Sequence, residues 1–230
     1  MRYNTGNMKK EVIIAVKKTL YSLMLNDEVV REVDALAHRL GTNRSNLINE
    51  ILAEYVNYTT PERRINDILS AIQEMMLPSG DLVPFFAPHS DSLSLKSSLE
   101  YKYRPTIKYE VELYKGGGET IGSLSVLFRT QSPALIASMT DFFRLWKRIE
   151  NAHLAPLLNA SVDYALYEGK FVRTITVPDM ACSSNELATS IAEYIRLFDK
   201  MMKGWLTGRY DAHAVEAAYY SYMTNTGIHF

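Results

Sequence analysis

The fold of the amino-terminal part is decided by residues 19–57, which read TLYSLML NDEVVREVDALAHRL GTNRSNLINEILAEYVN. Residues 19–25 alternate with the period of two that is typical of a β-strand. Successive side chains of a strand point to opposite faces. One face would carry Tyr21, Leu23 and Leu25, and the other would carry Leu20, Ser22 and Met24. The sequence therefore predicts a strand with two distinct faces directly ahead of a helical pattern.

Two amphipathic helices are predicted after this strand. Asn26 can cap the first helix, and Asp27 and Glu28 place negative charge where the helix dipole favours it. Gly41 is a typical helix terminator, and Asn43 can cap the second helix. The apolar positions recur at helical spacing: Val29, Val30, Val33, Leu36, Ala37 and Leu40, then Leu47, Ile48, Ile51, Leu52, Tyr55 and Val56.

A strand and two helices within about 40 residues cannot bury a strand face and two apolar helix stripes on their own. Two copies can, because their strands pair as an antiparallel ribbon and four helices close over its inner face. The pattern therefore predicts a homodimer. Its core would contain Tyr21, Leu23, Leu25, Val33, Leu36, Leu47, Ile48, Ile51 and Leu52. A two-stranded ribbon also fits the major groove of B-DNA.

Residues from about 17 to 57, roughly a sixth of the chain, resemble the Arc/MetJ/CopG family of ribbon-helix-helix DNA-binding proteins. The shared features are a short basic and polar strand, a polar cap after Leu25, an amphipathic helix, Gly41, and the polar turn 42–45 that opens the second helix. The resemblance implies that outward strand residues read base edges, here Lys18, Leu20, Ser22 and Met24. It also implies that the start of the second helix grips phosphate, with Lys17, Asn43, Arg44 and Ser45 as the contacts.

The expected base readers depart from the family pattern, which favours polar or basic side chains. Leu20 and Met24 can touch a thymine methyl group, but only Ser22 can hydrogen-bond to a base. Either specificity is modest, or Lys18, Thr19 and the preceding arm supply it. The alternative to DNA binding is that the module serves only to dimerise the chain.

The charge distribution favours DNA binding by a local patch. The net charge is −1 and the pI is about 6.5, so the chain as a whole is not basic. Residues 1–16 form a predicted basic arm, and the cations before residue 26 are opposed there only by Glu11. Doubled in a dimer, this charge is enough to neutralise several phosphates.

The rest of the chain predicts a further helix and then an α+β domain. Thr60 and Pro61 open a helix that extends to about residue 77, so that the first module covers residues 17–77. The Pro- and Gly-interrupted residues 78–94 are expected to be a linker. Residues 95–230 would form a domain for sensing or oligomerisation, with antiparallel strands, a hairpin at Gly116–Gly118, a helix over 133–151, a second hairpin at Gly169, and helices over 184–206 and 210–223.

Patterns that would indicate an enzyme are weak. Gly116–Gly118 is flanked by strands and lacks the Lys-Ser/Thr of a phosphate loop. The spacing from Arg148 to His153 resembles the Arg-x4-His signature of HEPN-type ribonucleases, but a helix terminus with a histidine near its dipole is the more ordinary interpretation. Cys182 is the only cysteine, and the five histidines lack ligand spacing. We expect no enzyme, no metal and no cofactor.

These observations predict an α+β protein in which a dimeric ribbon-helix-helix module precedes a sensor or oligomerisation domain. We expect a transcriptional regulator that represses by occupying double-stranded DNA as a homodimer. The alternatives are a plasmid or phage segregation protein and the antitoxin of a toxin–antitoxin pair. The second domain would meet a small molecule or a protein partner. No run of 18 apolar residues predicts a membrane span, and a cytoplasmic, nucleoid-associated location is expected.

Overall fold

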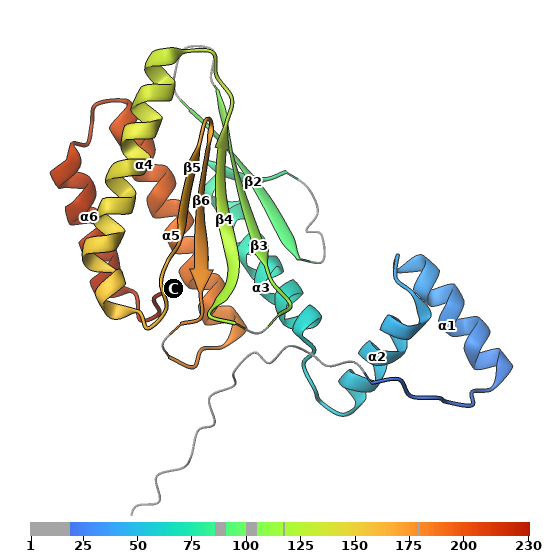
Figure 1. The fold of residues 1–230 in the computed structure, drawn as a ribbon. Coiled ribbons are helices and arrows are strands. Elements are labelled where there is room, and N and C mark those ends of the chain that lie inside the picture. Colours follow the sequence, from blue (N-terminus) through green and yellow to red (C-terminus); the bar gives the residue numbers. More distant parts are fainter. Residues whose placement is uncertain (1–18, 86–90, 100–104, 117, 179) are drawn as a thin grey trace, which may run out of the picture.

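The computed structural model describes residues 19–85, 91–99, 105–116, 118–178 and 180–230 (Figure 1). The expected basic arm, Lys17 and Lys18 lie outside these residues. The helices are α1 (Asp27–Arg39), α2 (Arg44–Tyr55), α3 (Pro61–Met76), α4 (Pro133–His153), α5 (Ser184–Leu206) and α6 (Ala212–Asn225). The strands are β1 (Leu82–Pro84), β2 (Ser92–Ser98), β3 (Thr106–Leu113), β4 (Thr120–Phe128), β5 (Tyr164–Tyr167) and β6 (Lys170–Thr176), with short 3-10 turns at Leu77–Ser79 and Ala155–Leu157.

The first two helices begin and end where the sequence predicts. The Asn26 side chain accepts a hydrogen bond from the Glu28 amide over 2.8 Å, and Asn43 accepts one from the Asn46 amide over 2.9 Å. Gly41 has a φ of +63°, a conformation that side-chain-bearing residues rarely adopt and that ends α1. α1 and α2 pack on each other through Ala37 and Leu47, and they stand apart from the sheet (Figure 1).

The strands form one antiparallel sheet in the order β1-β2-β3-β4-β6-β5. The predicted hairpins are confirmed: β3 and β4 pair across the glycine turn, and β5 and β6 pair across Gly169, whose φ is +73°. β4 is a central strand whose pairing with β6 shifts register between Thr120 and Gly122. Only glycine fits at 122, because a Cβ there would sit 2.3 Å from the Glu112 carbonyl oxygen. After β4 the chain forms α4 and then the β5–β6 hairpin, whose strand β6 pairs with β4 on the edge opposite β3.

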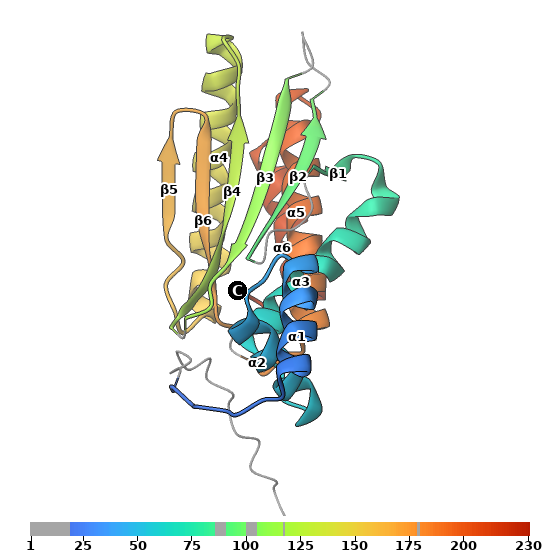
Figure 2. The same cartoon turned by 90° about the vertical axis from the view of Figure 1, so that its right-hand side faces the viewer.

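The helices α4, α5 and α6 gather on one face of the sheet (Figures 1 and 2). The core between these layers is aromatic: Phe142 and Trp146 of α4 meet Phe198 of α5, with ring centroids 5.4 and 4.9 Å apart. Alternate strand residues such as Tyr109 and Val111 point into this core. Within the described residues no helix covers the opposite face of the sheet (Figure 2), and its side chains are largely polar, as expected for a solvated antiparallel sheet.

A buried ion pair lies within the core. Arg173 of β6 donates through Nε to both carboxylate oxygens of Glu150 on α4, over 3.1 and 3.2 Å, and both side chains are almost completely buried. The other two guanidinium nitrogens of Arg173 donate to the backbone oxygens of Thr174 and Phe230. Burial raises the pKa of Tyr219, so its hydroxyl stays protonated and donates to Glu150 over 3.3 Å. The pair is thus surrounded by hydrogen-bond partners, which a buried charge requires.

Two expectations about the middle of the chain need correction. α3 was assigned to the amino-terminal module, but its apolar stripe is buried in the core of the sheet domain, where α3 packs against α5. The expected linker, 78–94, instead contains β1 and the start of β2. The prolines mislead here because β1 is an edge strand, where a residue without an amide hydrogen is tolerated, and Pro84 ends it.

Candidate nucleic-acid interface

Residues 19–25, the expected ribbon strand, form no strand in the structure, and this expectation is corrected for the single chain. A ribbon strand has its hydrogen-bond partner in a second copy, so a single chain gives it no backbone to pair with. All the side chains of this segment are exposed, and Tyr21, on the expected dimer-core face, is 81% exposed. Leu20 and Met24, expected to face DNA, are essentially fully exposed, whereas Leu23 and Leu25, expected to face the dimer core, are 53% and 41% exposed.

Most residues of the expected dimer core are uncovered in the single chain. Leu47 is buried between α1 and α2, and Val33, Leu36 and Ile48 are half-buried. Tyr21, Leu23, Leu25, Ile51 and Leu52 are exposed. Neighbouring apolar side chains add to this surface: Val29, Leu40, Tyr55 and Val56. Solvent-exposed apolar residues in such number within about 40 residues indicate an interaction surface.

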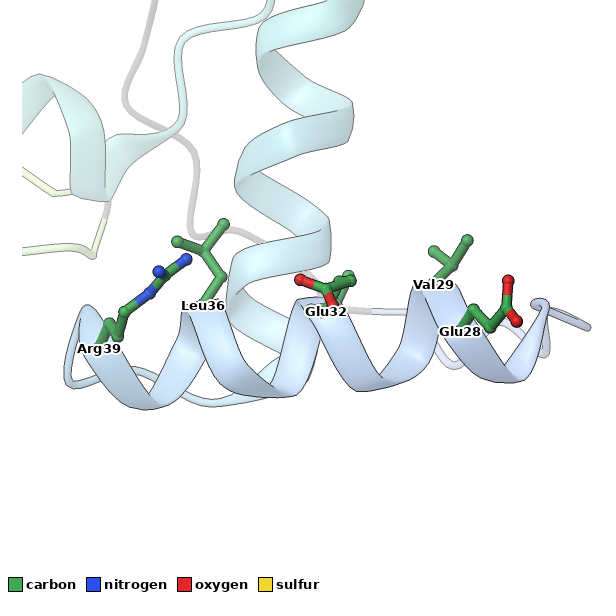
Figure 3. Close-up of a pocket in the computed structure, with 6 residues that line it drawn as sticks. Glu28, Val29, Glu32, Leu36 and Arg39 are labelled. Carbon is green, nitrogen blue, oxygen red and sulfur yellow. The ribbon is translucent and has the colours of Figure 1, made fainter.

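A shallow groove of about 370 Å³ runs along the exposed side of α1. Figure 3 shows Val29 and Leu36 rising from the helix, with Glu28 and Glu32 nearer its beginning and Arg39 at its end. The groove therefore has an apolar floor, an acidic end and a basic end. This arrangement is self-complementary for two helices that run in opposite directions.

The start of α2 presents the residues expected to contact phosphate. Asn43, Arg44 and Ser45 are all exposed, and the first amides of the helix lack acceptors within it, as at any helix start. The Arg44 guanidinium is not free. It donates from Nε to Asp34 Oδ1 over 2.6 Å and also bonds Oδ2, and this contact lowers the pKa of the Asp34 carboxyl. The pair bridges α1 and α2.

Asp34 is the residue of this site that the sequence reasoning missed. It lies ten positions before Arg44, beyond the three- or four-residue spacing that identifies ion pairs within one helix. Only the Gly41 turn, which folds α2 back against α1, brings the two side chains together. The one signal that the sequence offered was an acidic residue on α1, the helix that the turn at Gly41 folds back toward the start of α2.

The patterns weighed as signs of an enzyme or a metal site have ordinary surroundings. His153, at the end of α4, contacts Glu216 of α6 through Nε2 over 2.8 Å. Among the residues whose positions are described, no three His, Cys, Asp or Glu side chains gather as metal ligands would. Over that same part of the chain, no helix combines the length and the apolar character needed to cross a membrane.

Comparison of the chain with models of protein families, with curated proteins and with solved structures finds no match in any of the three. The function is therefore inferred from the residues and their geometry.

Proposed function

We propose that this chain is a homodimeric DNA-binding protein of the ribbon-helix-helix class that regulates transcription by occupying its site. Residues 19–25 of two copies would pair as a ribbon in the major groove. Ser22 and the apolar Leu20 and Met24 would meet base edges, and the starts of the two α2 helices would hold the flanking phosphates. The six-stranded sheet domain would carry the regulatory input.

The observation that carries this proposal is the exposure of the predicted dimer core. Side chains such as Leu23, Leu25, Ile51 and Leu52 have the spacing of interior residues, yet a single chain leaves them in contact with water. Each is already about half-buried, so covering the remainder would contribute roughly half of the about 1.5–3 kcal/mol that full burial gives. A second copy is the occupant that fits, because the predicted strand, the caps and the turn at Gly41 occur in the order that a ribbon-helix-helix dimer needs.

The groove on α1 supports the same two-fold arrangement. A two-fold axis places equal surfaces face to face in opposite directions. The acidic end at Glu28 and Glu32 would then approach the basic end at Arg39 of the other copy, on either side of the apolar floor. Opposite charges at both ends would fix the register of the two helices.

The decisive experiment compares two equally exposed leucines in the full-length protein. Leu52 of α2 and Leu157 of the 3-10 turn after α4 are both 51% exposed. Leu52→Asp should weaken dimerisation by at least about a hundredfold, because both protomers lose an apolar contact and gain a buried charge. Leu157→Asp should leave it unchanged. Sedimentation equilibrium measures the association, and footprinting on the DNA around the coding gene measures binding.

Loss of both the dimer and the footprint in Leu52→Asp alone is the expected result. A full-length protein that sediments as a monomer, or one in which both variants associate equally well, would refute the dimer. A wild-type dimer that protects no DNA and shows no salt-dependent retention on DNA would instead leave a dimerisation module without DNA binding, and would refute the function.

A further inference from the structure

A hollow of about 460 Å³ lies in the sheet domain, where the carboxy-terminal half of α5 meets β1 and the end of β2. Four cations line it: Arg196, Lys200 and Lys203 of α5, and Arg209 just beyond the helix. Of the residues that the structure describes, the lining acids are Asp81 and Asp199, so the described side chains give the hollow a net charge of +2 on a chain whose net charge is −1. Positive charge concentrated in a concave site attracts anions.

The four cations are held differently. Arg196 donates to the backbone oxygen of Met75 at the end of α3, and Lys203 Nζ lies 2.7 Å from Asp199 Oδ2. Lys200 and Arg209 make no ion pair within the described part of the chain. Two cations are therefore fixed at the walls, and two are available to a ligand.

The floor of the hollow positions Lys203. Asp199 is 4% exposed and uses both carboxylate oxygens, since it accepts the Tyr109 hydroxyl at Oδ1 over 2.9 Å and contacts Lys203 at Oδ2. A carboxylate that is buried and anchored in this way holds the ammonium group in one place. A merely solvated patch of lysines has no such support.

An apolar wall completes the hollow. Leu82 and Leu99 are buried at its edge, and Tyr210 lies across α5. The Tyr210 ring can lie there because residue 204 is glycine: a Cβ at Gly204 would be 1.9 Å from Tyr210 Cδ2. The site thus offers an aromatic surface beside the cations.

We propose that this hollow binds a small amphipathic anion, a phosphate or carboxylate group attached to a flat apolar body. Lys200 and Arg209 bind the anionic group beside the fixed ammonium of Lys203, and Tyr210 and Leu99 contact the apolar body. The volume lies within the range of about 300–1,000 Å³ that is common for small-molecule sites. This binding does not depend on whether the amino-terminal module binds DNA.

The test is calorimetric titration of the full-length protein with phenyl phosphate, benzoate, inorganic phosphate and phenol. Phenyl phosphate, benzoate or both should bind more tightly than inorganic phosphate, and phenol should not bind. Lys200→Gln with Arg209→Gln should weaken that binding at least about tenfold, since two charge-assisted contacts are lost. Both side chains are exposed, so the fold should be unaffected, which thermal unfolding checks.

The control removes the same net charge elsewhere, with Lys115→Gln and Arg129→Gln, two exposed cations outside the hollow. Affinity in the control should match the wild type. Equal weakening in both double variants would show general charge attraction, and no binding of either aromatic anion would overturn the site. Inorganic phosphate that binds as tightly as phenyl phosphate would overturn the role of the apolar wall.

Discussion

The Arg44 side chain reaches back from α2 to α1 and bonds both carboxylate oxygens of Asp34. Its charge is therefore already compensated where a DNA phosphate is proposed to bind. A phosphate must replace Asp34 as the partner of Arg44, and the carboxylate itself repels the phosphate. Arg44→Ala alone should then weaken DNA binding less than the loss of an unpaired cation would.

Asp34→Asn should strengthen DNA binding and steepen its salt dependence. The variant removes a negative charge from each phosphate site and frees Arg44 for a contact, and each added phosphate contact changes the slope of log K against log salt by about −0.9. Fluorescence anisotropy across a salt series measures both quantities. If Asp34→Asn weakens binding as much as Arg44→Ala does, then Asp34 positions Arg44 for DNA and this interpretation is wrong.

The Arg173–Glu150 pair gives a second prediction, for stability. Arg173→Met should destabilise the sheet domain by about 3–5 kcal/mol, because it leaves the Glu150 carboxylate buried without its partner. Adding Glu150→Met should recover most of this loss. Urea unfolding followed by tryptophan fluorescence measures both, since Trp146 and Trp205 lie in this domain. A single variant that costs less than about 1 kcal/mol would show that the pair contributes little.

At the level of elements, the sequence predicted what local chemistry determines. Asn26, Asn43 and Thr60 cap the helices that they were expected to cap, and Gly41 and Gly169 take the positive φ that their turns need. These signals act over a few residues and can therefore be read from the chain. The hairpin predicted at Gly116–Gly118 joins β3 to β4 for the same reason.

The element against which α3 packs could not be predicted from such local signals. The α3 apolar stripe of Ile65, Ile68, Leu69 and Ile72 shows that one side is buried but does not say against what. Its partner α5 begins more than a hundred residues later. Arg64 of α3 bonds the Cys182 carbonyl, and Arg196 of α5 bonds that of Met75, so both contacts join segments that sequence spacing does not connect.

A prediction follows for α3 as an element of the sheet domain. Ile72→Ala should lower the stability reported by Trp146 and Trp205 by about 2–5 kcal/mol, because Ile72 is fully buried in their core. The matched variant Leu47→Ala, at a buried position of α2, should leave that transition within about 0.5 kcal/mol, as expected for distant independent sites. Equal shifts in both variants would place α3 with the amino-terminal module instead.

Across the whole molecule, two regions are joined by the short connection between α2 and α3. The residues between Tyr55 and Pro61 can span no more than about 20 Å, because an extended chain covers at most about 3.3–3.6 Å per residue. In the proposed dimer, each sheet domain would therefore stay close to the DNA. The cationic hollow contacts the end of α3 through Arg196, so a ligand there would sit beside the element that leads to the module.

The packing of α3 against α5 also bears on how the protein is made. The contact from Arg196 to Met75 joins residues 121 positions apart, and a ribosome that adds about 5–20 residues per second needs about 6–24 s to make the later one. Throughout this interval α1 and α2 are already synthesised, while α5, the helix against which α3 packs, is not yet complete. We therefore expect the amino-terminal modules of neighbouring nascent chains to pair before either sheet domain closes. Dimers would then form mostly between products of one messenger RNA, and two alleles in the same cell would seldom mix.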